Sequence, residues 1–323
     1  MRLDIRYRML FEYDVPVWES QNELRVRPRS DERQQVIARR LTTSPSARVL
    51  SFVDYWGTTV DHVGVRDPHL SFEVVAEAAV ETAAQPAIEQ TVPVSVLAEP
   101  VFISAHAEYL APSSHSAPNP DLEARAHRAV VGVDDVAQQI QAMVSTTRSL
   151  LAYEPGATEI GVDLAHLVNG GVGVCQDFAH LTIALLRAVG TPARYVSGFL
   201  FAKDETTLQG DLGRPGQDDV VHVQTHAWVE AAVPGHGWFA VDPTNDVPVL
   251  DRHAIIGHGR DYDDVAPVRG VFFGQATPQV ETEVVIERMA PAARSVITDE
   301  PRRVNASEMT VRQQRMQQQQ QRS

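Results

Sequence analysis

Residues 170–200, GGVGVCQDFAHLTIALLRAVGTPARYVSGFL, decide how the rest of the chain is interpreted. After Cys175, apolar residues recur at three- and four-residue spacing, which predicts a helix with one buried face. The residues of this face are Ile183, Leu185, Leu186 and Val189. Gly190 and Pro192 follow in the order in which glycine and proline usually end a helix. We therefore predict that Cys175 lies at the N-terminus of a helix, or within one or two residues of it.

Cys175 is the only cysteine among the 323 residues, and its predicted position favours reactivity. A helix N-terminus carries unpaired N–H groups and a partial positive charge, and both favour the reactive thiolate. The preceding glycines would let a substrate backbone approach closely, and the backbone N–H of Cys175 could donate to an oxyanion. The alternative interpretation is that this lone cysteine is a small buried hydrophobic residue.

A nucleophilic thiol needs a base, and the base needs an orienting group. Residues 221–246, VHVQTHAWVEAAVPGHGWFAVDPTND, predict two strands joined by a turn at 234–237. A hairpin centred on residue 234 places His226 opposite Asp242, so that the carboxylate could accept a hydrogen bond from the imidazole. His222 shares the parity of His226 and is the alternative base.

Three motifs in this order, GVCQDFAHL, THAWVEA and WFAVDPTND, resemble the Cys, His and Asp motif set of the transglutaminase-like superfamily. GRDYDDVAPVRGVFFG at 259–274 and the region with RVRPRSDERQ and DYWGTTV resemble its bacterial members. The resemblance covers residues 1 to about 290. It implies an α+β fold with a papain-like or transglutaminase core, in which the helix bearing the cysteine packs on an antiparallel sheet. A β-rich N-terminal domain would precede this core.

The resemblance also implies a triad of Cys175, His226 and Asp242 that catalyses acyl transfer through a thioester on protein or peptide amides. No metal or other cofactor is required by this chemistry. Two alternatives stay open, a cysteine peptidase or amidase without crosslinking activity, and a non-catalytic peptide-binding module.

Four further residues are candidates for supporting the site. Gln176 follows the cysteine and could line the site or donate to an oxyanion, and Tyr153 is a second oxyanion candidate. Arg260 and Tyr262 belong to a polar cluster that could support the site beside Asp242, although a solvated turn explains them equally well.

Composition limits the classes of partner. The formal net charge is −14, which argues against nucleic acid and against anionic membrane surfaces, since both are bound through Lys and Arg. A single cysteine excludes an intramolecular disulfide, so an oxidising compartment is not needed. The first residues, MRLDIRYRMLF, alternate charged and apolar side chains and do not resemble a signal sequence. We expect a cytoplasmic protein with a protein or peptide substrate.

The chain is expected to divide into a β-rich domain at 1–95, the catalytic core at 96–290 and a disordered Gln-rich tail at 291–323. A turn is expected at 15–20, a loop at 108–120, and a helix at 135–151 that is capped by Asp134. Strands are expected at 3–11, 24–27, 36–41, 58–65, 70–80, 271–273 and 280–286.

Overall fold

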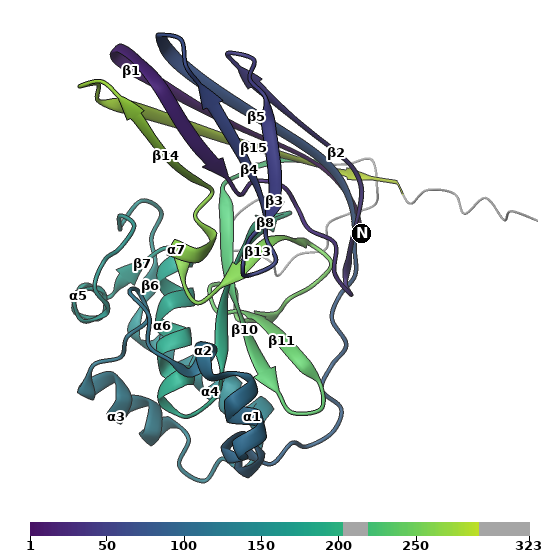
Figure 1. Ribbon diagram of the computed structural model, residues 1–323. Coiled ribbons are helices and arrows are strands. Elements are labelled where there is room, and N and C mark those ends of the chain that lie inside the picture. Colours follow the sequence, from purple (N-terminus) through teal and green to yellow (C-terminus); the bar gives the residue numbers. More distant parts are fainter. Residues whose placement is uncertain (203–218, 291–323) are drawn as a thin grey trace, which may run out of the picture. The chain divides into compact units, whose positions relative to one another are not determined.

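The computed structural model describes residues 1–202 and 219–290. An eight-stranded sheet, a five-stranded antiparallel sheet and a group of helices make up this part of the chain (Figure 1). The α+β class predicted from the sequence is therefore confirmed. The disordered tail predicted at 291–323 lies outside the described residues.

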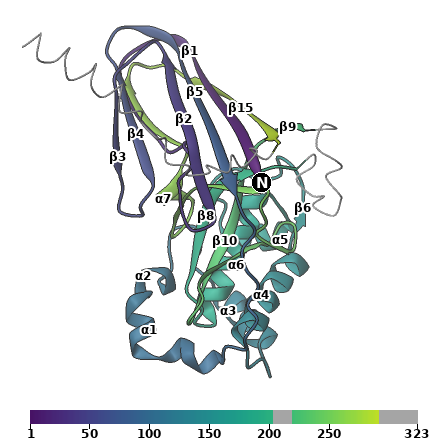
Figure 2. The ribbon, with the colours of Figure 1, turned by 90° about the vertical axis from the view of Figure 1, so that its right-hand side faces the viewer.

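The helix that begins at the cysteine is α6, Cys175–Ala188. Its start agrees with the prediction, and it ends before Gly190, whose φ is +81°. The carboxylate of Asp177 accepts a hydrogen bond from the backbone N–H of Val174 at 2.9 Å and so caps the helix. Burial extends further than one face, because every residue from 177 to 187 is buried. The reason is that α6 contacts β10 on one side and the helices α3 and α4 on the other (Figure 2).

The five-stranded sheet has the order β12–β11–β10–β8–β13. Its strands are β8 Ala193–Leu200, β10 Thr225–Val233, β11 Gly237–Asp242, β12 Val247–Pro248 and β13 His253–Gly259. The turn predicted between β10 and β11 is confirmed. The sequence pattern predicted no strand at 253–259, but this segment is β13, a strand that is buried along its whole length. A strand buried on both faces has no polar alternation, so the sequence pattern did not reveal it.

Helices lie against this sheet, and all of them except α7 precede α6 in the chain (Figure 2). They are the 3₁₀ helix Val94–Ala98, α1 Pro100–Ala105, α2 Ala107–Leu110, α3 Pro120–Ala129, α4 Val136–Leu150, α5 Leu164–Gly170 and α7 Tyr262–Val265. Two short parallel strands, β6 Ala152–Tyr153 and β7 Val172–Gly173, pair just before α6. The predicted helix at 135–151 is α4, but its cap is Asp135, which accepts from the Gln138 N–H. The loop expected at 108–120 begins only after α2.

The eight-stranded sheet is organised around its first strand. Its members are β1 Arg2–Leu24, β2 Gln34–Ser44, β3 Val49–Val53, β4 Thr59–Val65, β5 His69–Thr82, β9 Val220–Val223, β14 Val268–Phe273 and β15 Pro278–Met289. The turn predicted at 15–20 is wrong, because β1 continues through it with a shift in register between Glu12 and Val17. The bend changes the partners of the strand. Residues 2–12 pair with β5 and β15, and residues 20–24 pair with β4 and β14.

Strands from distant parts of the described chain therefore share one sheet. β15 pairs with β1 over its full length, and β9 pairs with β15 immediately before the chain enters β10 of the other sheet. The first of the two strands predicted within 221–246 is thus divided into β9, which belongs to the eight-stranded sheet, and β10, which forms the hairpin with β11. The division of the chain at residue 95 stays a prediction, but the large sheet is not built from residues 1–95 alone.

The two sheets contact each other through β8 and β13. The ring of Tyr7 on β1 lies 6.0 Å from that of Phe199 on β8. The side-chain amide of Gln34 donates to the Ile255 carbonyl and accepts from the Ile255 N–H, both at 2.8 Å. These contacts join the large sheet to β8 and β13 of the five-stranded sheet. None of the helices in the described part of the chain is long and apolar enough to span a membrane.

The close packing around Gly198 lets us predict the effect of a substitution on stability. A Cβ at this position would lie 2.3 Å from the Ala254 carbonyl oxygen and 2.4 Å from the buried ring of Trp228. Gly198→Ala should therefore lower the free energy of unfolding by about 1–3 kcal/mol, as overpacking does. Urea unfolding followed by far-UV circular dichroism measures this change.

Gly170→Ala is the matched control, because a Cβ added to Gly170 would have no atom within 4 Å and the residue has no positive φ. This variant should change the free energy of unfolding by less than about 0.5 kcal/mol. Equal effects of the two substitutions would contradict the packing argument.

Candidate active site

Cys175 is the first residue of α6, so its backbone N–H has no acceptor within the helix. The thiol is partly buried, and its Sγ lies 4.0 Å from the carbonyl oxygen of Thr225, at the start of β10. The sulfur therefore lies where the start of α6 meets the five-stranded sheet. This places a nucleophile, a helix N-terminus and a backbone donor at one point.

His226 follows Thr225 and is buried. Its Nε2 donates to Oδ2 of Asp242 at 2.8 Å, whereas its Nδ1 has no hydrogen-bond partner among the described residues. Burial opposes the charge of this ring, but the Asp242 carboxylate and the nearby Cys175 raise the pKa of His226 well above its usual value. The imidazolium form is therefore favoured next to the thiol.

Asp242 is completely buried at the end of β11. Its Oδ2 also accepts from the Asn245 side-chain amide at 2.7 Å, and its Oδ1 accepts from the backbone N–H groups of Thr244 and Asn245 at 3.0 and 3.2 Å. Burial alone would raise the pKa of Asp242, but attraction to His226 and hydrogen bonds from His226 and His253 hold it well below its ordinary value. The carboxylate is therefore ionised.

The register between β10 and β11 differs from the predicted one. Val229 pairs with Val241 and Glu230 with Ala240, and the same register continued would place Asp242 opposite Trp228. The prediction that Asp242 lies directly opposite His226 is therefore wrong by two positions along β10. An even shift keeps both side chains on one face of the sheet, so the hydrogen bond forms between diagonal neighbours.

His253 on β13 is a fourth member of this cluster and was not predicted from the sequence. Its Nε2 donates to Asp242 Oδ2 at 3.2 Å, and its Nδ1 accepts from the Leu250 N–H at 3.2 Å. Burial lowers the pKa of His253, and the hydrogen bond to Asp242 opposes this only in part. The neutral ring therefore carries its proton on Nε2. No pattern around His253 indicates this role, since two strands, β10 and β8, separate β13 from β11 in the sheet.

His226, Asp242 and His253 also form a group whose ligand atoms lie within 4.8 Å of one another. Such a group could in principle hold a metal ion. However, the Leu250 N–H occupies Nδ1 of His253 and so places the proton on the nitrogen that a metal would need. The hydrogen bonds favour proton donation to Asp242 over metal ligation.

The two oxyanion candidates, Gln176 and Tyr153, belong to segments next to the cysteine. The Gln176 amide donates to the Glu159 carbonyl at 3.4 Å. Tyr153 on β6 is aligned with Gly173, two residues before Cys175, and its ring lies 6.4 Å from that of Phe178. Their roles at an oxyanion stay predictions.

Of the two residues predicted in the polar cluster near residue 260, one contacts groups away from Asp242 and the other packs near Cys175. The guanidinium of Arg260 donates to Oδ2 and Oδ1 of Asp264 at 2.9 and 3.1 Å and lies over the ring of Trp56. These contacts direct it away from Asp242. Tyr262 donates its backbone N–H to His180 at 3.2 Å and packs against the same apolar cluster as Cys175. The alternative base, His222, is exposed on β9 and lies 3.8 Å from Glu283 in the large sheet.

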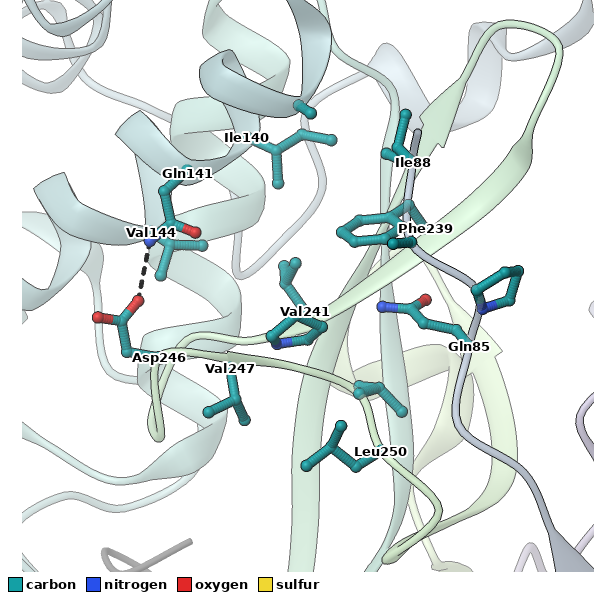
Figure 3. Close-up of a pocket in the computed structure, with 15 residues that line it drawn as sticks. Gln85, Ile88, Ile140, Gln141, Val144, Phe239, Val241, Asp246, Val247 and Leu250 are labelled. Atoms are coloured by element: carbon teal, nitrogen blue, oxygen red, sulfur yellow. Dashed lines mark hydrogen bonds between the residues drawn. The ribbon is translucent and has the colours of Figure 1, made fainter. Parts of the chain in front are cut away.

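A cavity of about 360 Å³ lies on the side of β11 that faces α4 (Figure 3). The side chains of Phe239 and Val241 point toward it, and Gln141 on α4 donates to Asp246 at 3.0 Å. Arg148, also on α4, donates to the carbonyl oxygens of Pro243 and Thr244. These bonds tie the loop that follows Asp242 to α4. The proposed catalytic side chains do not line this cavity.

Two family models match the chain. The model of the transglutaminase-like superfamily matches residues 123–243, and that of the bacterial transglutaminase-like N-terminal region matches residues 3–81. The first range contains Cys175, His226 and Asp242, and the second contains most of the β1–β5 part of the large sheet.

Related proteins match over different shares of the chain. An uncharacterised protein of Mycobacterium leprae is 34% identical over 292 residues, which are 90% of this chain and 99% of that protein. A protein-glutamine gamma-glutamyltransferase of Pseudomonas aeruginosa is 35% identical over 118 residues, which are 34% of this chain and 16% of that enzyme.

A solved structure resembles nearly the whole fold. It is that of a protein of Cytophaga hutchinsonii proposed to be a cysteine protease, with a TM-score of 0.67 and 22% sequence identity. The match covers 90% of this chain and 92% of that one. Together with the family models and the mycobacterial relative, it agrees with the resemblance seen in the motifs. The chain belongs to the transglutaminase-like superfamily and carries the bacterial type of N-terminal region.

Proposed function

We propose that the protein is a thiol-dependent acyltransferase or hydrolase that acts on protein or peptide amides, with Cys175, His226 and Asp242 as its catalytic triad. The observation that carries this proposal is the 2.8 Å hydrogen bond between His226 Nε2 and Asp242 Oδ2. It leaves Nδ1 as the free nitrogen of a ring that neighbours the only thiol in the chain. This arrangement supplies a nucleophile, a base and an orienting carboxylate.

In the proposed reaction His226 Nδ1 holds the proton of Cys175, as an imidazolium–thiolate pair, and the thiolate attacks the carbonyl carbon of a substrate amide. The tetrahedral oxyanion accepts the backbone N–H of Cys175 at the start of α6. His226 then protonates the leaving ammonia or amine, and a thioester remains on the sulfur. An incoming amine or water loses a proton to His226, attacks the thioester and releases the thiol. Asp242 holds the ring and stabilises its cationic form throughout.

Amine attack would give transfer, and water attack would give deamidation or proteolysis. The transfer reaction is favoured by the local identity to an enzyme that is a protein-glutamine gamma-glutamyltransferase by name. The alternative is a cysteine peptidase or amidase without crosslinking activity. A non-catalytic binding module is disfavoured, because burying a charged His–Asp pair is costly and binding alone does not require it.

Turnover of a labelled glutamine peptide, with and without a fluorescent primary amine, tests the proposal. The wild-type protein should release ammonia from the glutamine, and Cys175→Ala and His226→Ala should each lower the rate by roughly 10³-fold or more, because members of a triad act as a unit. Mass spectrometry of the peptide measures both products.

The two enzymatic alternatives give different products in this assay. Amine incorporation identifies a transferase, whereas a glutamate product alone identifies a hydrolase. Turnover that persists in Cys175→Ala would contradict the proposal in either form.

The raised pKa of His226 predicts how thiol alkylation depends on pH. Because the imidazolium persists above pH 6.5 and favours the thiolate, iodoacetamide should alkylate Cys175 rapidly even at mildly acidic pH. Asp242→Asn removes the charge that raises the pKa of His226. The imidazolium should then be lost at a lower pH, and alkylation near pH 6.5 should slow by about tenfold or more.

Asp246→Asn is the matched control, since Asp246 lies four residues further along and binds Gln141, on α4. Its alkylation profile should follow that of the wild type. A profile of Asp242→Asn that overlays the wild-type curve would show that the carboxylate does not act through His226. The lone cysteine makes the labelled site unambiguous.

His253 should act as a positioning residue, because its Nε2–H group donates to the Asp242 carboxylate. His253→Leu removes this donor and should lower kcat by about 10- to 100-fold, the range expected for a lost hydrogen bond to a charged group. His253→Gln keeps an N–H donor of similar reach and should recover most of the rate. Steady-state kinetics with the glutamine peptide measure both variants. Equal losses in the two would indicate a packing role only.

A further inference from the structure

A second cavity, of about 470 Å³, lies between the bent strand β1 and the start of β10. The lining comes from β1, from β14 and β15 near the other end of the described chain, and from residues next to the candidate site. Residues Tyr7, Met9, Phe11, Tyr13, Phe272 and Val280 form much of its apolar wall. Figure 1 shows β14 running from the end of α7 along β1. The large sheet therefore supplies one wall of a pocket whose other wall belongs to the core.

This pocket is adjacent to the reactive sulfur. Thr225 lines it, and the carbonyl oxygen of Thr225 lies 4.0 Å from Cys175 Sγ. Tyr262 lines it too and packs on the same apolar cluster as Cys175. A chain whose carbonyl group meets the thiol could thus continue directly into the pocket.

The chemistry of the lining restricts what the pocket can hold. None of the described residues that line it carries a charged side chain, although 22% of the whole chain is charged. Val280 and Ile160 at its rim are more than half exposed, so apolar surface stays open to solvent there. Such a lining favours an uncharged apolar or aromatic side chain and disfavours Asp, Glu, Lys and Arg.

One polar group within the lining lacks a partner. Asn22 on β1 is only 6% exposed, and its Nδ2 makes no hydrogen bond to any described residue. Its Oδ1 faces Gly270 of β14, where a Cβ would lie 2.3 Å from that oxygen. A buried amide donor without an acceptor is costly, and a peptide carbonyl would satisfy it.

We propose that this pocket binds an apolar side chain of an extended peptide substrate, close in sequence to the residue whose carbonyl meets Cys175. The Asn22 amide would donate to a backbone carbonyl of the same peptide. This inference rests on the proposed function, because it takes the thiol as the point at which the peptide is attacked. It assigns to the large sheet a part in choosing the substrate.

Direct binding to the Cys175→Ala protein tests the pocket without catalysis. The probes are fluorescein-labelled heptapeptides with a central glutamine in an alanine background, in which each flanking position in turn carries Phe, Leu, Asp or Lys. At one flanking position Phe or Leu should lower the Kd by about tenfold or more relative to Asp or Lys. Fluorescence anisotropy measures each Kd.

Two substitutions, one on β15 and one on β14, distinguish the pocket from the rest of the sheet. Val280→Glu puts a charge at the rim and should abolish the preference for Phe. Val271→Glu is the control, because Val271 is 69% exposed on β14 and does not line the pocket. Asn22→Ala should weaken all bound peptides by a similar factor, about two- to tenfold, since it removes a backbone contact. Far-UV circular dichroism checks that each variant is folded.

Failure of the pocket and failure of the proposed function give different results. Absence of binding, absence of an apolar preference, or equal effects of Val280→Glu and Val271→Glu would overturn the pocket proposal, even if glutamine peptides are turned over. Selective binding without any turnover by the wild-type protein would retain the pocket and reject the proposed reaction.

Two other occupants would also be detected. A fluorescent fatty acid that binds where no peptide does would assign the cavity to an acyl chain. A dimer seen in sedimentation that Val280→Glu alone disrupts would assign it to a second copy of the chain. Either result would overturn the peptide proposal.

Discussion

The buried carboxylate of Asp242 is the constraint on which the candidate site depends. An ionised carboxylate with no access to water is costly unless donors surround it. Here the donors come from three places, His226 on β10, the backbone and amide of residues 244–245, and His253 on β13. The order of the five-stranded sheet is what brings these segments together. One charge therefore couples the turn after β11, two histidines and the position of the ring next to Cys175.

The large sheet contributes to the same site from outside the core. β1 bends near residues 13–17, exchanges one set of partners for another and leaves a hollow above the start of β10. Gln34 attaches this sheet to β13, which carries His253, and Tyr7 attaches it to β8, which lies between β13 and β10. Separate family models match residues 3–81 and 123–243, but these two regions do not form two independent structures. The N-terminal region forms its sheet together with β14 and β15, which follow the core.

Short-range patterns were sufficient for the elements whose causes are local. The start of α6 at Cys175, its end before Gly190, the turn between β10 and β11, and the strands β2, β4 and β5 follow from periodicity and from glycine and proline positions. The bend in β1 contains a proline and polar residues, so it was interpreted as a turn. Pairing with β5 and β15 before the bend and with β4 and β14 after it keeps the strand continuous, and this pairing is not visible in the residues themselves. The same holds for β13, whose buried residues show no alternation.

The sequence by itself determined that the one thiol lies at the start of a helix, that a histidine and an aspartate share one face of a hairpin, and which family these motifs belong to. The tertiary structure decided the register that makes His226 and Asp242 diagonal neighbours, the presence of His253 beside them, and the direction of Arg260 away from them. It also decided that β1, β14 and β15 form a wall next to the sulfur. The physical reason is that periodicity reports which face of an element is buried but not which segment lies against that face. The neighbour depends on pairing between segments that can be more than 200 residues apart in the chain, as β1 and β15 are.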